Sequence, residues 1–370
     1  MLSYEQLTMN SNVADAFFAS RDKAAPIVFF GAGFALKGIL QRFEQKGFTA
    51  LSICDNDKKK HGRQILGYTV QSLDQVASLP DTKTFVVTSP AYFWEIKEQL
   101  ETQFGANSVC PVDFNCTHYF SGKQFQPYFT QHIERFKAVE AFLADDLSRQ
   151  VYRQVLKAHS TGKREDFESI PRVDDDWYLF KSLLAADEDS VYVDCGAFDG
   201  DTITLFNKTS KGRYKHIYAF EPDKNILEAL AACIADNGID NVTIIPKGVY
   251  NRNGSIGFSW DGVYSAVSES NASVMDKKND DGIEVVRIDD ELKDVPVSII
   301  KMDLEGAELN ALKGAKDTIQ KHHPKLGICL YHNIIDLLEI PEYIHDIAPD
   351  YRIYIRHHST SCNDTIMYTV

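Results

Sequence analysis

Val191-Tyr-Val-Asp194-Cys-Gly196-Ala-Phe-Asp199-Gly200-Asp201-Thr202 combines an apolar strand, a glycine turn and the start of a helix. Gly196 and Gly200 would let a ligand approach the backbone, and the amide groups that begin the helix would attract negative charge. A glycine-rich turn is by itself also typical of a plain α/β connection. The segment therefore predicts an α/β domain, with a ligand site at this turn if further residues support one.

A carboxylate at the end of the next strand gives that support. The strand ends in Phe220-Glu221-Pro222-Asp223, and Glu221 follows Gly196 by 25 residues. This interval is close to the ~20 residues that separate a glycine turn from a ribose-binding acid. Two strands that end in acids, together with the turn, predict a nucleoside pocket.

A third group of charges follows a later strand, in Ile300-Lys301-Met302-Asp303-Leu304-Glu305-Gly306-Ala307-Glu308. Strand alternation would send Lys301, Asp303 and Glu305 to one side. Ligands of open α/β sheets bind beyond the carboxyl ends of the strands, so these residues lie where chemistry is expected. Glu308 falls in a first helical turn, where an acid stabilises the helix dipole.

Strands and helices alternate through the whole carboxyl-terminal half. The predicted strands are 191–194, 217–220, 242–245, 297–302 and 325–330, followed by 351–356 and 365–370 without a helix between them. An antiparallel hairpin at the end of a parallel sheet is common in mixed sheets.

These motifs, with Leu330-Tyr331-His332 and Tyr351-Arg-Ile-Tyr-Ile-Arg-His-His358, resemble those of FkbM-type methyltransferases, which use S-adenosylmethionine. The resemblance covers about residues 175–370. It implies a class I methyltransferase Rossmann-like sheet with an antiparallel last strand. It also implies that S-adenosyl-L-methionine contacts the following residues: Asp194, Gly196, Phe198, Gly200, Asp201, Thr202, Glu221 (at the ribose) and Asp303 (near the methyl group).

Methyl transfer to a neutral hydroxyl requires alignment of the two reactants and a group that removes the proton. On the resemblance, His332 is the first candidate base and Asp303 the second, and Glu305 and Lys301 complete the catalytic set. Asp303 and Glu305 could also hold a hard divalent ion. No multi-ligand spacing demands a metal, so we assign no metal site and leave open whether a divalent ion is needed.

The amino-terminal part predicts a second, smaller Rossmann-like α/β domain. Strands at 26–30, 50–54 and 84–88 alternate with helices, and Gly31-Ala-Gly33 follows the first strand. Leu36 stands where a dinucleotide-binding turn has its third glycine, and Asp55 follows Gly33 by 22 residues, which fits either a ribose-binding acid or an ordinary Asp-rich turn. This part resembles the amino-terminal domains of bacterial nucleotide-sugar acetyltransferases, which implies sugar recognition with Gly31, Gly33 and Asp55 as candidates.

The length and helix spacing predict three segments. We expect a Rossmann-like domain at 1–113, a helical bridge at 114–175 and the methyltransferase domain at 176–370. Within the bridge, apolar residues recur at helix spacing from Ile133 to about Leu156, and Asp145-Asp146 could break or recap that helix.

Composition limits the partners and the compartment. The formal charge of −14 disfavours nucleic acid, and the longest uncharged stretch, 24–36, is too short to span a membrane. The amino terminus lacks the basic and apolar regions of a secretory signal. Seven scattered cysteines without a Cys-x-x-Cys pair predict reduced thiols, which fits the cytoplasm.

The leading hypothesis is an S-adenosylmethionine-dependent O-methyltransferase that acts on a sugar hydroxyl in a glycan or a nucleotide-linked sugar. One alternative is an NAD(P)-dependent oxidoreductase that uses the turn at Gly31. Another is a non-catalytic nucleotide-sugar-binding protein with a methyltransferase fold. The sequence leaves the acceptor, the methylated position and homo-oligomerisation open.

Overall fold

A computed structural model describes most of the chain. The described residues are 3–8, 12–33, 35–79, 83–89, 92–110, 112, 125–173, 178, 180–259, 266–268 and 282–370. They form two compact units, one made of 1–131, 154–170 and 360–362 and the other of 132–153, 171–359 and 363–370. The domain boundaries expected near residues 113 and 175 lie outside the described residues, and the predicted helical bridge is divided between the two units.

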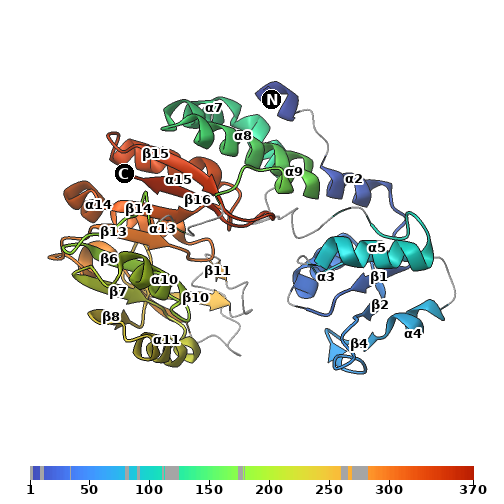
Figure 1. Cartoon of the computed structure of the whole chain (residues 1–370). Coiled ribbons are helices and arrows are strands. Elements are labelled where there is room, and N and C mark those ends of the chain that lie inside the picture. Colours follow the sequence, from blue (N-terminus) through green and yellow to red (C-terminus); the bar gives the residue numbers. More distant parts are fainter. Residues whose placement is uncertain are drawn as a thin grey trace. The chain divides into compact units, whose positions relative to one another are not determined.

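The amino-terminal unit is a three-layer α/β sandwich (Figure 1). Its sheet has the order β3-β4-β2-β1-β5. Alternate residues of the buried strand β1 face opposite layers, so Ile27 and Phe29 pack with α3, whereas Val28 and Phe30 pack with α5. The elements are α1 (Tyr4–Thr8), α2 (Val13–Ser20), β1 (Ile27–Phe30), α3 (Ala35–Gln45), β2 (Ala50–Cys54), β3 (Gln64–Ile65), β4 (Tyr68–Gln71), α4 (Leu73–Ala77), β5 (Thr84–Val87), α5 (Phe93–Phe104), α6 (Phe125–Gln131) and α9 (Arg164–Glu168).

The carboxyl-terminal unit is built on a seven-stranded sheet of order β15-β16-β14-β13-β6-β7-β8. The last strand, β16, lies between β14 and β15 and runs antiparallel to both. This arrangement confirms the predicted class I methyltransferase sheet with an antiparallel last strand. Its strands are β6 (Val191–Cys195), β7 (His216–Phe220), β8 (Val242–Ile245), β13 (Ile299–Met302), β14 (Lys325–Cys329), β15 (Ile353–His357) and β16 (Thr365–Thr369).

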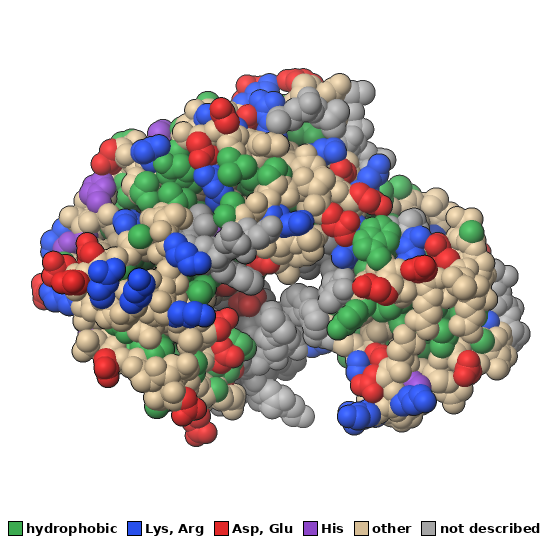
Figure 2. Space-filling view, in the orientation of Figure 1, with side chains coloured by type: hydrophobic (Ala, Val, Ile, Leu, Met, Phe, Trp, Pro, Cys, Tyr) green, Lys and Arg blue, Asp and Glu red, His purple; other side chains and the backbone are tan. Residues whose placement is uncertain are grey.

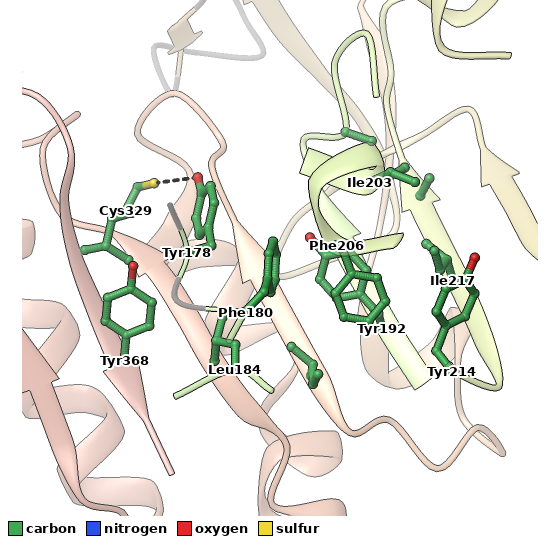
Figure 3. Packing of buried hydrophobic residues seen from close by; sticks show 14 of the residues in the cluster. Tyr178, Phe180, Leu184, Tyr192, Ile203, Phe206, Tyr214, Ile217, Cys329 and Tyr368 are labelled. Carbon is green, nitrogen blue, oxygen red and sulfur yellow. Dashed lines mark hydrogen bonds between the residues drawn. The ribbon is translucent and has the colours of Figure 1, made fainter. Parts of the chain in front are cut away.

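One face of this sheet packs against α10 and α11 through large aromatic and aliphatic side chains (Figure 3). Tyr192 of β6 stacks on Phe206 of α10 with ring centroids 4.3 Å apart, and Phe180 meets both rings edge-on. Offset and edge-to-face aromatic pairs stabilise a core beyond their buried area. The helices of the unit are α7 (Ile133–Phe142), α10 (Asp201–Ser210), α11 (Lys224–Asp236), α12 (Ile288–Glu291), α13 (Glu308–Lys313), α14 (Lys316–His322) and α15 (Asp336–Ile347).

The predicted helix 133–156 is interrupted where the sequence indicates a break. Helix α7 ends at Phe142, and α8 (Asp146–Thr161) begins directly after Asp145, whose carboxylate accepts the amide hydrogen of Ser148 at 2.7 Å. The same carboxylate pairs with Arg356 of β15, and this hydrogen-bonded pair lowers the pKa of Asp145 to about 2 against the opposing effect of burial. The break therefore attaches the helices to the sheet.

A small second sheet is inserted between β8 and β13. It has the order β11-β10-β12-β9, with β9 (Gly248–Val249), β10 (Gly254–Ser259), β11 (Ala266–Ser268) and β12 (Ile283–Val286). Ile256 and Val285 from this sheet pack against Leu304 and Ala307, which follow β13. The insertion thus supports the loop between β13 and α13.

Among the described helices, none is both long and apolar enough to cross a bilayer. Figure 2 shows Asp and Glu side chains interspersed with Lys and Arg on the visible face.

Candidate active site

Four parallel strands bring the predicted residues to one edge of the sheet. The carboxyl ends of β6, β7, β13 and β14 lead to Asp194, Glu221, Asp303 and His332 respectively. Because these strands are neighbours in the order β14-β13-β6-β7, the residues from all three sequence motifs meet there.

A buried ion pair lies beneath this edge. Asp194 and Lys301 are register partners on adjacent strands, so their side chains share one face. The Lys301 ammonium lies 3.0 Å from Asp194 Oδ1 and donates to the Gly196 carbonyl at 2.7 Å. Burial alone would lower the pKa of Lys301, but the carboxylates of Asp194 and Asp303 raise it above its usual range.

The contacts of Asp194 and Lys301 hold the turn from below. The second oxygen of Asp194 accepts hydrogen bonds from Tyr192 at 3.0 Å and from Thr202 at 2.7 Å. Both Asp194 and Lys301 are buried. They join β6, β13 and the first turn of α10 below the site.

The two glycines of the turn are required by close packing of the protein itself. Both adopt positive φ, +84° at Gly196 and +90° at Gly200. A Cβ at residue 196 would fall well inside 3.0 Å of the Asp303 carbonyl oxygen, and one at residue 200 would crowd Leu230 and Cys233 of α11. The sequence predicts that a ligand approaches these two α-carbons, but the backbone after β13 and the side chains of α11 fill the space beside them.

Glu221 closes the turn from the neighbouring strand. Its carboxylate accepts the amide hydrogens of Phe198 at 3.0 Å and Asp223 at 2.8 Å. Burial raises the pKa of Glu221, although these two hydrogen bonds act in the opposite direction. Phe198 has φ +46°, and the residue is 52% exposed, which is unusual for a large apolar residue.

Asp303 is held by hydroxyl donors from two directions. Tyr178 donates to its Oδ2 at 3.0 Å, and Tyr331 reaches both oxygens at 3.3 Å. Burial alone would raise the pKa of Asp303, but His332, Lys301 and the two hydroxyl groups lower it. A carboxylate with these donors stays ionised and fixed in direction.

Tyr178 is a site residue that sequence reasoning missed. It precedes β6, its φ is +61°, and its buried hydroxyl also lies 3.4 Å from Cys329 Sγ (Figure 3). The sequence offers no signal for it, because its neighbours Asp174-Asp-Asp-Trp177 indicate only a polar loop.

His332 lies between carboxylates. Its Nδ1 is 2.7 Å from Glu308 Oε1, and its Nε2 is 3.3 Å from Asp303 Oδ1 and 3.7 Å from Glu305 Oε2. Burial alone would lower the pKa of His332, but Glu308, Asp303 and Glu305 outweigh it and raise the pKa to about 10. His332 is thus an imidazolium at neutral pH when only these protein groups surround it, and an imidazolium cannot accept a proton.

Glu305 is the least constrained acid of the group. Its side chain is 33% exposed and its backbone adopts φ +53° directly after the strand. Burial, together with Asp303 and Glu308, raises the pKa of Glu305 to about 7. Backbone strain of this kind is often kept at functional sites.

Glu308 begins α13, as the sequence predicts, and also serves the site. Its Oε1 accepts the amide hydrogen of Leu304 at 2.7 Å as well as facing His332. By contrast, His357 is buried within β15, with Nδ1 2.9 Å from the Thr365 hydroxyl. His357 therefore has a structural role.

In the amino-terminal unit, Asp55 stabilises its own turn. Its Oδ2 accepts the Ala32 amide hydrogen at 2.7 Å and pairs with Lys60 at 2.8 Å, while Oδ1 accepts the Asp57 amide hydrogen. The carboxylate thereby joins the loop after β2 to the Gly31-Ala-Gly33 turn. Gly31 adopts φ +117° against Thr88 and Ser89 of the strand-end beside it, whereas a Cβ at Gly33 would meet nothing within 4 Å.

Comparison with known proteins agrees with this geometry. Residues 194–360 match the methyltransferase FkbM domain family. The crystal structure of the methyltransferase FkbM from Methylobacillus flagellatus KT is 24% identical, covers 99% of this chain and 97% of its own, and superposes with a TM-score of 0.74. No curated protein matches the sequence.

Two other solved structures are more distant. An rRNA methylase from Streptococcus thermophilus is 16% identical, with 52% of this chain and 90% of that chain covered and a TM-score of 0.33. Aeropyrum pernix fibrillarin, crystallised with S-adenosyl-L-methionine, is 13% identical, with 52% and 72% covered and a TM-score of 0.33. Because both TM-scores are well below 0.5, we draw no conclusion about this chain from these two structures.

The strand order and the clustered strand ends define the carboxyl-terminal unit as a class I methyltransferase fold. Within that unit, residues 194–360 are similar to the methyltransferase FkbM domain family.

Proposed function

We propose that the protein is an S-adenosylmethionine-dependent methyltransferase that methylates a sugar hydroxyl in a glycan or a nucleotide-linked sugar. The observation that carries the proposal is the meeting of Glu221, the turn at 196–202 and the cluster around Asp303 at one edge of an FkbM methyltransferase domain.

The cofactor is proposed to lie across the ends of β6 and β7. Each oxygen of a carboxylate can accept two hydrogen bonds, so Glu221 keeps capacity for ribose hydroxyls beside its two amide donors. Asp201 and Thr202 lie in the first turn of α10, where the proposed contacts of the methionine part would form. Asp194 and Lys301 are proposed to act as positioning residues, because both are buried under the turn.

The acceptor is proposed to lie beside Asp303, Glu305 and His332. The acceptor oxygen would form a bond to the methyl carbon while the carbon–sulfur bond breaks and its electron pair stays on sulfur. We assign the leaving hydroxyl proton to Glu305, because its side chain is 33% exposed, whereas both ring nitrogens of His332 face carboxylates and Asp303 accepts from two tyrosine hydroxyls. This changes the sequence-based ranking of His332 as the first candidate base.

The amino-terminal unit is proposed to contribute to recognition of the sugar, in keeping with its Rossmann-like sheet. The carboxylate of Asp55 is engaged by Ala32, Asp57 and Lys60. A Cβ placed at Gly33 would have no atom within 4 Å, so a ligand has room there. We therefore assign the sugar contact to the backbone of Gly33 in preference to the side chain of Asp55. We also propose that the chain is divided functionally into the three segments predicted from the sequence, with boundaries at residues 113 and 175.

A direct test of the proposal uses S-adenosylmethionine labelled in the methyl group and two acceptor panels. One panel contains nucleotide sugars and polysaccharides, and the other contains amines and carboxylic acids of similar size. Label should appear on sugar oxygen, as located by mass spectrometry of the product. Label found only in the second panel would contradict the assignment of the acceptor.

Replacing Asp303 by Asn should lower kcat by ~10²-fold or more and change the Kd of S-adenosylhomocysteine by less than ~3-fold. The reason is that Asp303 orients the acceptor and its neighbours, whereas Glu221 and the turn hold the cofactor. Single-turnover methyl transfer and isothermal titration measure the two quantities. An equal loss of both would make Asp303 a cofactor residue instead.

A further inference from the structure

We propose that Asp303, Glu308 and His332 bind a divalent cation of the Mn²⁺ class, which holds the hydroxyl group that receives the methyl. The inference rests on the proposed methyltransferase function for its role, but the cation site itself stands on geometry. Sequence spacing indicated no metal, because the three residues come from three separate elements.

The three side chains converge as cation ligands do. One ligand atom from each of Asp303, Glu308 and His332 lies within 4.8 Å of the other two. For metal–ligand bonds of about 2.1 Å, neighbouring ligand atoms lie ~3–4 Å apart. His332 can offer only one ring nitrogen to an ion. The 3.3 Å from its Nε2 to Asp303 already lies in that range, whereas Glu308 now lies 2.7 Å from Nδ1 and must turn toward the same side of the ring to share the ion. Binding also requires the ring to release the proton on the nitrogen that holds the ion.

An unpaired atom gives independent support. Glu308 is 0% exposed, its carboxylate faces His332, and its Oε2 has no hydrogen-bond partner. A buried carboxylate oxygen without a partner is costly, and a bound cation removes that cost.

The charges around the cluster also favour a cation. Glu305 adds a further carboxylate 3.7 Å from His332 Nε2, and buried Asp336 at the start of α15 has an unpaired Oδ2. The nearby ammonium of Lys301 is paired with Asp194. Apart from His332 itself, the described residues that face this cluster supply no other unpaired positive charge.

The ligand types and their exposure define the cation and its use. Two carboxylates and one imidazole suit Mn²⁺ or a similar first-row ion better than the all-oxygen sites that Mg²⁺ prefers. Glu308 is fully buried, whereas the side chain of Asp303 is 28% exposed, so the cluster opens on one side only. A hydroxyl bound there would lose its proton more readily, with Glu305 beside it to accept the proton.

The test is isothermal titration of the chelator-treated full chain with MnCl₂, without cofactor. Wild-type protein should bind one Mn²⁺ per chain. Glu308→Gln and His332→Asn should each weaken that binding by at least ~10–100-fold. Glu188→Gln is the matched control, because Glu188 is an exposed carboxylate outside the cluster, and it should bind Mn²⁺ as wild type does.

Thermal unfolding and titration with S-adenosylhomocysteine establish that each variant is folded. No Mn²⁺ binding by folded wild-type protein would overturn the proposal, and so would binding that neither cluster variant weakens. Mn²⁺ is titrated without cofactor, so a failure of the cation proposal appears as absent Mn²⁺ binding. A failure of the proposed methyltransferase function appears instead as absent S-adenosylhomocysteine binding.

Discussion

Replacing Lys301 by Met is expected to lower the free energy of unfolding by ~3–5 kcal/mol. Asp194 is fully buried, and the Lys301 ammonium 3.0 Å away is the cation paired with it. Removing only the ammonium leaves the carboxylate buried without its counter-charge. It also removes the hydrogen bond to the Gly196 carbonyl. Chemical denaturation followed by tryptophan fluorescence and circular dichroism measures the loss.

The matched control is the double variant Asp194→Asn with Lys301→Met. It removes both charges and retains a polar side chain for Tyr192 and Thr202, which hydrogen-bond to Asp194. We expect the double variant to recover more than half of the stability that Lys301→Met loses. A single Lys301→Met variant within ~1 kcal/mol of wild type would contradict the account of this ion pair.

Replacing Gly196 by Ala is expected to cost about 3 kcal/mol or more of stability. The added Cβ would collide with the backbone oxygen of Asp303, and the φ of +84° is itself unfavourable for alanine. Neither strand can yield cheaply, because β6 and β13 are hydrogen-bonded neighbours in the middle of the sheet. Denaturant titration measures the change.

Gly238→Ala separates the two causes. Gly238 also has a positive φ, +58°, but an added Cβ there would meet nothing within 4 Å. This variant should lose only the backbone term of ~1–2 kcal/mol. If the Gly196 and Gly238 variants lose the same amount, the close approach of the turn to β13 is not what requires glycine at residue 196.

Much of the main sheet could be predicted because its strands are short apolar runs bounded by turn residues. The predicted strand 242–245 coincides with β8 of this sheet, as does 50–54 with β2 of the amino-terminal sheet, and the break predicted at Asp145-Asp146 falls directly before and at the start of α8. Here local pattern and tertiary packing favour the same structure.

Other elements depend on tertiary contacts that the local sequence pattern does not indicate. The hairpin β3–β4 turns through Leu66 at φ +51° and Gly67 at φ +82°, and leucine is a rare residue at positive φ. In the small sheet, β9 and β11 have only two and three residues, and the apolar cluster of this sheet is completed by Ala307 and Leu304, which follow β13. Neither group has the periodicity of a longer strand.

The candidate site could be predicted in its residue types better than in their roles. The alternation of side chains along β13 predicts that Lys301 and Asp303 lie near the site. Only the register of β13 with β6 shows that Lys301 forms an ion pair with Asp194. The protonation of His332 depends on Glu308 and Glu305, which reach it from a different part of the chain. Tyr178 enters from a polar segment for the same reason, since its role exists only in the folded state.

The most direct test of the central claim is isothermal titration of wild-type protein with S-adenosylhomocysteine, with Glu221→Gln as the variant and Glu188→Gln as the control. We predict one binding site per chain. The Glu221 variant should bind ~10-fold or more weakly, because hydrogen bonds to a charged acceptor contribute ~1.5–3 kcal/mol, and the control should bind as wild type does. Well-folded wild-type protein that does not bind S-adenosylhomocysteine at millimolar concentration would contradict the account.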